Sequence, residues 1–161
     1  MSLQDRIKSD VTAAMRSGDT LRRDVLRMVQ SAAYTVEKRD RRTLTDDDYA
    51  AVIGREVKTR RESVEAFRAG AREDLAAREE AEIAILADYL PEQLTESEIQ
   101  ALIDEAISAT GASSARDLGK IMGWLSPKTR GRADGKRVSE LVATSLAAID
   151  LAVHDTGGHR A

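Results

Sequence analysis

The chain has no cysteine and only two histidines among its 161 residues. Without cysteine it forms no disulfide bond, no thiolate metal site and no thiol nucleophile. Both histidines, His154 and His159, lie near the C-terminus outside any helical pattern. Two ligands on such a segment cannot hold a closed metal site, and neither is placed to activate a serine. We therefore expect no metal and no Ser-His or Cys-His catalysis.

Proline and aromatic residues are scarce too, with two prolines and 3% aromatics, and no alternation of apolar and polar residues indicates a strand. Abundant alanine, leucine, arginine and glutamate are typical of helices. No apolar run approaches the roughly 20 residues of a membrane span, and residues 1–10 lack the apolar core of a signal peptide. The sequence thus predicts an all-α, cytoplasmic protein with no membrane association.

Helical periodicity predicts two units that meet at Pro91. The first is an N-terminal helical domain over 1–91, with four amphipathic helices at about 3–17, 21–36, 46–69 and 73–90. The second is a small three-helix bundle over 92–150, with helices at about 96–110, 115–125 and 135–149. The remaining residues, 151–161, have no pattern and are predicted to be disordered.

Helix start signals support this division. Thr45 with Asp48 and Thr95 with Glu98 have the spacing of capping boxes, and Asp134 is placed to cap the last helix. The three consecutive aspartates that start the third helix lie where the helix dipole favours negative charge. They therefore need no metal ion to explain them.

Arg60 and Glu79 each fall on the inward stripe of a predicted helix, so both point at the partner helix. We predict a structural ion pair between Arg60 and Glu79, within a wider set in which Arg60 or Arg61 pairs with Glu79 or Glu82 across an antiparallel helix pair. The alternative is that Arg60 packs its aliphatic part at the core edge and extends its guanidinium into water. Glu79, Glu80 and Glu82 as metal ligands are less favoured than a salt-bridged surface.

The segment 116–137 carries seven basic residues against two acidic ones, a local surplus of five positive charges in a chain whose net charge is −3. Such a surplus favours a polyanion as partner, although a solvated loop between two helices would also explain it. An isoelectric point near 5.5 argues against a nonspecific nucleic-acid coat protein, so a binding surface has to be a local patch. The basic residues of this candidate patch are Lys120, Lys128, Arg130, Arg132, Lys136 and Arg137.

Four glycines and the single tryptophan accompany these charges. Gly119 and Gly123 share one face of a helix, while Gly131 and Gly135 flank a turn. Small residues four positions apart permit either close helix packing or the approach of a nucleic-acid backbone. Trp124 either packs against the bundle or lies exposed beside the basic loop as a stacking platform.

Three sequence motifs in and after this segment resemble the C-terminal tail domain of GatB, a subunit of the glutamine-dependent tRNA amidotransferases. They are Gly119-Lys120-Ile121-Met122-Gly123, Gly131-Arg132-Ala133-Asp134-Gly135-Lys136 and Glu140-Leu141-Val142. Upstream, residues 54–94 (GREVKTRRESVEAFRAGAREDLAAREEAEIAILADYLPEQL) resemble the free-standing YqeY proteins, which share this helical-plus-tail unit. The resemblance covers roughly residues 3–146.

The resemblance implies a tRNA-binding accessory module in translation. It would contact the tRNA elbow, where the D-loop meets the T-loop, by shape and phosphate contacts and without reading a sequence. The basic residues of the candidate patch would neutralise phosphates, and the backbones of Gly119, Gly123, Gly131 and Gly135 would allow close approach. Implied partners are tRNA and either an amidotransferase or an aminoacyl-tRNA synthetase.

Catalysis is not expected from this chain alone, although the family association is with carbon–nitrogen ligases that use glutamine as amido donor. The large catalytic portion of GatB, with its zinc- and ATP-binding residues, has no counterpart here. No Walker or GxGxxG motif is present, so we expect no cofactor. Ser113 and Ser114 lie near Lys120 but lack a Gly-Ser-rich amidase signature, and Ser114 suits a helix cap.

Two other hypotheses remain open at this point. A helical protein–protein adaptor without RNA binding would use the apolar faces of the first four helices to dock a partner. An enzyme in its own right would need a polar pocket between the two units, around Arg60, Arg61 and Glu79.

Overall fold

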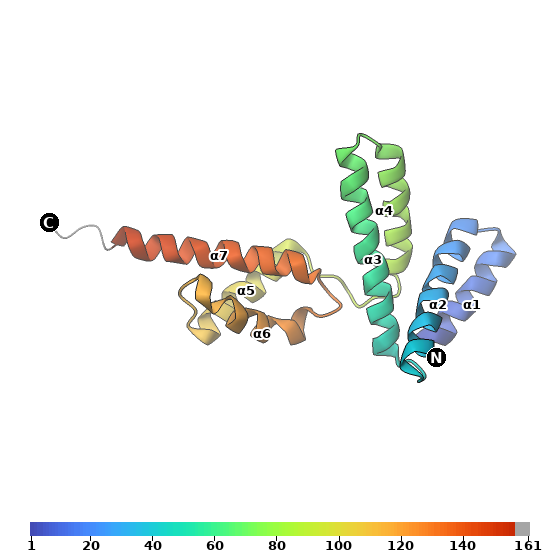
Figure 1. Cartoon of the computed structure of the whole chain (residues 1–161), viewed down its shortest axis with the longest axis horizontal. Coiled ribbons are helices and arrows are strands. Elements are labelled where there is room, and N and C mark those ends of the chain that lie inside the picture. Colours follow the sequence, from blue (N-terminus) through green and yellow to red (C-terminus); the bar gives the residue numbers. More distant parts are fainter. Residues whose placement is uncertain (157–161) are drawn as a thin grey trace. The chain divides into compact units, whose positions relative to one another are not determined.

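The computed structural model describes residues 1–156, and within them all regular secondary structure is helical (Figure 1). This confirms the predicted all-α class. The chain divides into two compact units, which we call unit 1 (Met1–Pro91) and unit 2 (Glu92–Ala161). Each unit has its own apolar core and is described by itself. None of the helices within 1–156 is long and apolar enough to cross a membrane.

Unit 1 consists of four helices that share one core. They are α1 (Leu3–Ser17), α2 (Thr20–Asp40), α3 (Asp46–Ala69) and α4 (Glu73–Ala87). Each contributes a fully buried side chain: Ile7, Leu26, Ile53 and Leu86 are all 0% exposed. Burial of one such side chain stabilises the fold by roughly 1.5–3 kcal/mol. The apolar stripes of the sequence are therefore used to build unit 1 itself.

The start of α3 shows how the local sequence sets a helix end. The Thr45 hydroxyl accepts from the backbone N–H of Asp48, and the Asp48 carboxylate accepts from the backbone N–H of Thr45, which is a complete capping box. Arg42 also pairs with Asp48 at 2.6 Å. The guanidinium, with the Thr45 donors, holds the pKa of the Asp48 carboxyl far below its usual range.

Helices α3 and α4 form an antiparallel hairpin with Arg60 buried inside it, only 5% exposed (Figure 1). Its Nε donates to Glu82 of α4 at 3.2 Å, and its Nη1 donates to the carboxylate of Glu56 at 2.8 Å. The cross-helix ion pair is therefore made by Glu82, which confirms the wider prediction that Arg60 or Arg61 pairs with Glu79 or Glu82. The choice of Glu79 as the particular partner was wrong. The alternative of a guanidinium extended into water does not fit a side chain that is 6% exposed.

Tyr89, just after α4, anchors the end of unit 1 to α1. Its side chain is 5% exposed, and its hydroxyl donates to the Asp10 carboxylate at 2.5 Å. The guanidinium of Arg6 lies over the ring, 4.6 Å from the centroid, and donates to the Asp88 carbonyl at 3.1 Å. Burial, with the adjacent Asp10 carboxylate, raises the pKa of Tyr89 to about 12.

We expect the stabilising contribution of Tyr89 to be lost at high pH. Because its pKa rises from 10.0 to about 12 on folding, the contribution is complete below pH 10 and disappears as the pH passes 12. The difference in free energy of unfolding between wild type and Tyr89→Phe should therefore shrink between pH 10 and 12, as measured by urea unfolding. Tyr34→Phe, at a ring that is 58% exposed, is the matched control. A Tyr89→Phe difference that stays constant over this range would contradict the expectation.

Over its described residues, 92–156, unit 2 is a bundle of three α-helices and one short 3-10 helix. Its elements are α5 (Glu96–Thr110), η1 (Ala115–Asp117), α6 (Leu118–Thr129) and α7 (Gly135–Thr156). Ile103, Leu125 and Leu146 are 0% exposed and form the centre of its core. The predicted disorder from residue 151 is wrong for 151–156, which continue α7, while 157–161, including His159, lie outside the described residues.

The segment that enters α5 is hydrogen-bonded to the loop that joins α6 to α7. The backbone N–H of Leu94 donates to the Arg132 carbonyl at 2.8 Å, and the Gln93 side chain donates to the Gly131 carbonyl at 2.9 Å. In return, the Nε of Arg132 donates to the Glu92 carbonyl at 3.1 Å. These bonds fix the loop 130–134 against the rest of unit 2.

Candidate nucleic-acid interface

The outer face of α6 is bare at Gly119 and Gly123. Both glycines are exposed, and a Cβ atom built on either would meet no heavy atom within 4 Å. The two glycines therefore do not mediate close helix packing, which was one of the two explanations that their spacing allowed. A strip of helix backbone without side chains is left open between charged residues, so a flat or bulky ligand can approach it closely.

Five of the six predicted basic residues are exposed, and four of the five have no carboxylate partner within the described residues. Lys120 and Lys128 belong to α6, Arg130 begins the following loop, and Lys136 is in the first turn of α7. None of the four forms an ion pair with any residue of the described part of the chain. Their charge is thus not offset by a contacting carboxylate. We call Lys120, Lys128, Arg130 and Lys136 the open cations.

The other two predicted residues are engaged within unit 2. Arg137 lies between Glu96, at 2.6 Å, and Glu140, at 3.3 Å, and the guanidinium lowers the pKa of the Glu96 carboxyl. Arg132 is partly buried and uses its Nε to hold Glu92. Sequence reasoning could not separate these two from the open cations, because charge and spacing do not show which guanidinium has a local partner.

The position of Arg130 depends on the glycine that follows it. Gly131 has a φ of 75°, in the left-handed region, where a residue with a Cβ is strained. The N–H of Arg130 donates to the Ser126 carbonyl at 3.0 Å and ends α6. Together with the bonds that fix the loop 130–134, this turn presents Arg130 from a rigid support, which lowers the entropy lost on binding.

Trp124 projects from α6 beside Gly123 and is partly buried against the core of unit 2. The ammonium of Lys128 lies over its ring, 4.4 Å from the centroid. This is the distance of a cation–π contact. The tryptophan therefore combines both alternatives from the sequence, since it packs on the bundle and also borders the exposed basic face.

Ser113 and Ser114 serve the start of η1. The Ser114 hydroxyl accepts from the N–H of Arg116, and the Asp117 carboxylate accepts from the backbone N–H groups of both serines at 2.8 and 3.3 Å. These donors lower the pKa of the Asp117 carboxyl. The arrangement is a helix cap, with no hydrogen bond between either serine and Lys120.

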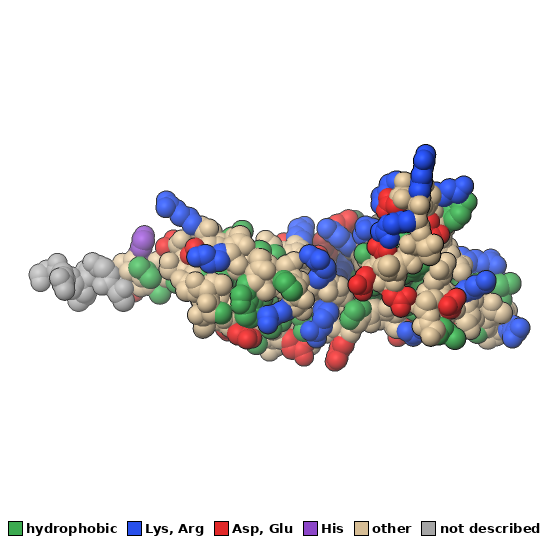
Figure 2. Space-filling view, turned by 90° about the horizontal axis from the view of Figure 1, so that it is seen from below, with side chains coloured by type: hydrophobic (Ala, Val, Ile, Leu, Met, Phe, Trp, Pro, Cys, Tyr) green, Lys and Arg blue, Asp and Glu red, His purple; other side chains and the backbone are tan. Residues whose placement is uncertain are grey.

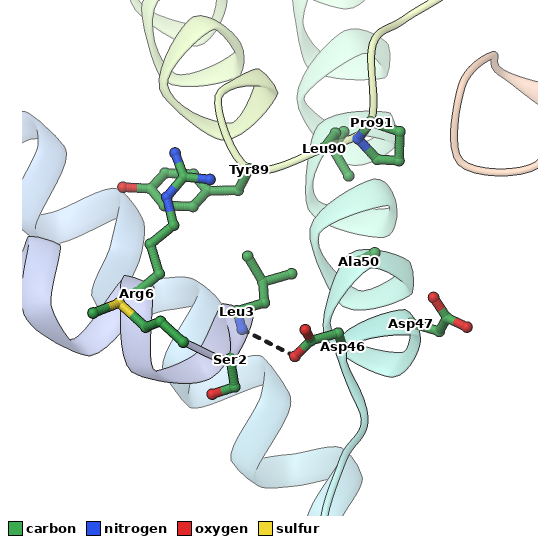
Figure 3. A pocket seen from close by; sticks show the side chains of 10 residues that line it. Ser2, Leu3, Arg6, Asp46, Asp47, Ala50, Tyr89, Leu90 and Pro91 are labelled. Atoms are coloured by element: carbon green, nitrogen blue, oxygen red, sulfur yellow. Dashed lines mark hydrogen bonds between the residues drawn. The ribbon is translucent and has the colours of Figure 1, made fainter.

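Unit 1 contains an open pocket of about 350 Å³ where α1, α3 and the segment after α4 meet (Figure 3). Its polar groups contact one another: the N–H of Leu3 donates to Asp46 at 2.9 Å, and Arg6 is held by Tyr89 and Asp88. Within 1–156 there is no group of three or more His, Asp or Glu placed to hold a metal ion. The pocket lies where helices meet, and its polar groups are bonded to one another, so they do not point together toward a ligand position.

The charges of unit 2 are spread over its surface. In the left half of Figure 2, Lys and Arg side chains stand apart from one another, with apolar surface, uncharged surface and some Asp and Glu side chains among them. Such spacing suits contacts to separate phosphates along a nucleic-acid backbone, since each basic side chain can reach its own phosphate.

The fold and this surface define a class of protein: an all-helical, two-unit chain whose C-terminal bundle carries a local group of basic side chains on and beside α6. The family model for Yqey-like proteins matches residues 4–146. The chain belongs to the YqeY-like family.

Two relatives have been identified in fungi. One, from Pyrenophora tritici-repentis, is named altered inheritance of mitochondria protein 41, mitochondrial. It is 31% identical over 140 residues, which cover 85% of this chain and 77% of the relative. The other is an uncharacterised protein of Schizosaccharomyces pombe, 31% identical over 91 residues, which cover 56% of this chain and 74% of the relative.

Proposed function

We propose that unit 2 binds tRNA by shape and phosphate contacts, and that the chain acts as an accessory module for a tRNA-dependent enzyme of the amidotransferase or aminoacyl-tRNA synthetase type. The chain itself carries out no reaction in this proposal. The observation that carries it is the set of open cations on and beside α6, together with the bare backbone at Gly119 and Gly123. A cytoplasmic location is part of the same proposal.

The physical argument rests on what unpaired exposed cations favour. A phosphate gains a charge-assisted hydrogen bond from each, and its condensed counterions are released into solution. The open strip at Gly119 and Gly123 lets an RNA backbone approach α6 without meeting a side chain. Contacts of this kind do not distinguish one base from another, so they recognise the shape of a folded RNA.

The likeness of unit 2 to the GatB tail supports tRNA over other polyanions. The three shared motifs span the bare face of α6, the fixed loop and the first half of α7. The elbow of tRNA, where two loops meet, is the part of the RNA that the resemblance assigns to this surface.

The adaptor hypothesis has less support in the structure. It requires apolar faces on the first four helices that remain available to a partner, but these faces form the core of unit 1. The large apolar side chains left exposed in unit 1 are Met1, which precedes α1, Met15 of α1, and Met28 and Tyr34 of α2.

The enzyme hypothesis is weakened as well. Arg60, which it placed in a polar pocket, uses its donors on Glu56 and Glu82 inside a helix hairpin. Neither carboxylate is left to act as a base without breaking that network.

The test is fluorescence anisotropy of a labelled tRNA transcript with the full chain, at 50 and 200 mM salt. We expect binding to folded tRNA that is much tighter than to a simple RNA hairpin. Affinity should fall steeply with salt, with a slope of about −3 to −4 in log–log form if four cations each neutralise one phosphate. Equal affinity for the hairpin would remove the shape-reading role, and no binding to tRNA would overturn the proposal and favour the adaptor.

A further inference from the structure

Trp124 is held by the core on one side and is open on another. It packs against the core cluster of unit 2, yet it is only partly buried. Its indole N–H, a hydrogen-bond donor, has no acceptor among the described residues. A partly buried tryptophan whose N–H faces no protein acceptor has a polar edge available to a ligand.

Lys128 marks the accessible face of the ring. It follows Trp124 by one helical turn, and its ammonium lies 4.4 Å from the ring centroid while the side chain as a whole remains exposed. An exposed cation–π contact of this type stabilises by only about 0.5–1 kcal/mol. The lysine is therefore easily displaced by a ligand that stacks better on the indole.

The helix backbone next to Trp124 carries no side chain at Gly123. Gly123 precedes Trp124, and Gly119 lies one turn further back on the same face of α6. A Cβ at either position would find nothing within 4 Å. A nucleotide bound at the ring can therefore bring its own backbone close to α6 at Gly123.

We propose that Trp124 and Lys128 form a stacking site for an unpaired nucleobase of an RNA loop, an assignment that rests on the proposed tRNA-binding function. The base takes the place of the Lys128 ammonium over the indole, and the freed lysine contacts the phosphate of the same nucleotide. The open cations favour an anionic ligand, and a nucleotide combines an aromatic base, which can stack, with a negatively charged phosphate. The site therefore favours loops with unstacked bases over regular duplex.

The first test uses Trp124 as its own reporter, because it is the only tryptophan in the chain. A tRNA transcript should quench its fluorescence on titration with the wild-type protein, whereas a blunt-ended RNA duplex of equal charge should bind through phosphates and leave the emission unchanged. Quenching of equal depth by both RNAs would show that charge alone alters the signal, and the stacking site would be rejected.

The second test compares Trp124→Leu with Trp124→Phe by anisotropy of labelled RNA. Stacking on an aromatic ring contributes a factor of roughly 5 to 150 per base. Trp124→Leu should weaken tRNA binding by this factor and leave duplex binding unchanged, while Trp124→Phe should keep most of the tRNA affinity. Circular dichroism shows whether each variant is folded. If Trp124→Leu is not folded, the quenching experiment with the wild-type protein decides whether the stacking site exists.

The outcomes separate the two proposals. Loss of tRNA binding on removal of the open cations, with unchanged binding by Trp124→Leu, would overturn the stacking site and leave the proposed function intact. Failure of the wild-type chain to bind any RNA would overturn both.

Discussion

Replacement of the four open cations by glutamine is expected to weaken tRNA binding by roughly 100- to 1,000-fold, since each loses a charge-assisted contact worth on the order of 1 kcal/mol or more. The variant carries Lys120→Gln, Lys128→Gln, Arg130→Gln and Lys136→Gln. Glutamine keeps much of the length and the helix propensity of lysine, so the fold of unit 2 should persist. The measurement is labelled-tRNA anisotropy over a range of salt concentrations.

The salt dependence of tRNA affinity is the most specific test of this prediction. Each phosphate contact that is lost should reduce the slope of log affinity against log salt by about 0.7–0.9, so the fourfold variant should lose a slope of about 3. A variant that is merely destabilised would lose affinity without this change in slope. The comparison therefore separates a lost electrostatic contact from a damaged fold.

A matched control removes the same charge from unit 1. It replaces four exposed cations that lie outside any ion pair of the described residues: Lys8→Gln, Arg16→Gln, Arg55→Gln and Lys58→Gln. Its net charge equals that of the fourfold variant of unit 2. If both variants lose affinity equally, the binding follows net charge alone and the surface of unit 2 has no special role.

Arg137→Gln provides a second comparison within unit 2. Because Arg137 already contacts Glu96 and Glu140, its removal should change tRNA affinity far less than removal of any one open cation. The same sequence segment thus contains residues with different expected effects, which the linear charge pattern cannot show.

The sequence predicted the capped helix starts and the glycine stops well, because they depend on local chemistry. The helices predicted to end at about 36, 90 and 125 instead end at Asp40, Ala87 and Thr129. The Thr45 and Thr95 capping boxes form as their spacing indicates, and α5 ends at Gly111 with a φ of 69°, a conformation that glycine adopts easily. The end of α7 was missed. Residues 151–156 contain neither glycine nor proline, so nothing in the local sequence stops the helix where the apolar pattern fades.

The partner of Arg60 was within reach of a geometric argument. The turn between α3 and α4 is centred on Ala71, and both helices rise by the same amount per residue. Residues equally far from Ala71 therefore lie level, and Arg60 and Glu82 are each eleven positions from it. Periodicity alone favoured Glu79, because it gives the face of a helix but not the height at which two helices meet.

The bare face of α6 could not be predicted from the sequence. Spacing places Gly119 and Gly123 on one side of the helix, but two different arrangements of the bundle are compatible with that spacing. The choice depends on how α5 and α7 pack on α6 through Ile121 and Leu125, which are 0% exposed. These residues turn the glycines outward, so the exposure of the candidate site is set by tertiary packing.

Replacement of Arg60 by alanine should lower the free energy of unfolding of unit 1 by about 3 kcal/mol, which is typical of a broken buried ion pair. Glu56 and Glu82 would lose their shared cation, although their side chains are 25% and 16% exposed and can gain some water. The aliphatic part of Arg60 also packs between the helices, and its loss adds to the cost. Arg60→Lys keeps the charge but loses the fork of donors, so an intermediate effect is expected.

Urea unfolding followed by two signals measures this effect. Far-UV circular dichroism reports both units, whereas the fluorescence of Trp124 reports unit 2, so the fluorescence transition is an internal reference. Arg61→Ala, at the next residue and outside any ion pair of the described chain, should change stability by less than about 0.5 kcal/mol. Equal effects of Arg60→Ala and Arg61→Ala would mean that the buried network contributes nothing particular.

The double variant Arg60→Met with Glu82→Leu distinguishes a stabilising network from one that is only costly to break. Removing Arg60 and Glu82 leaves only Glu56 without its cation, and this carboxylate is 25% exposed and can be hydrated. Apolar replacements of buried ion pairs are often neutral or stabilising. We expect the double variant to recover most of the stability that Arg60→Ala loses. If it remains as unstable as Arg60→Ala, the hydrogen bonds of Arg60 to both sides of the hairpin contribute directly to the stability of unit 1.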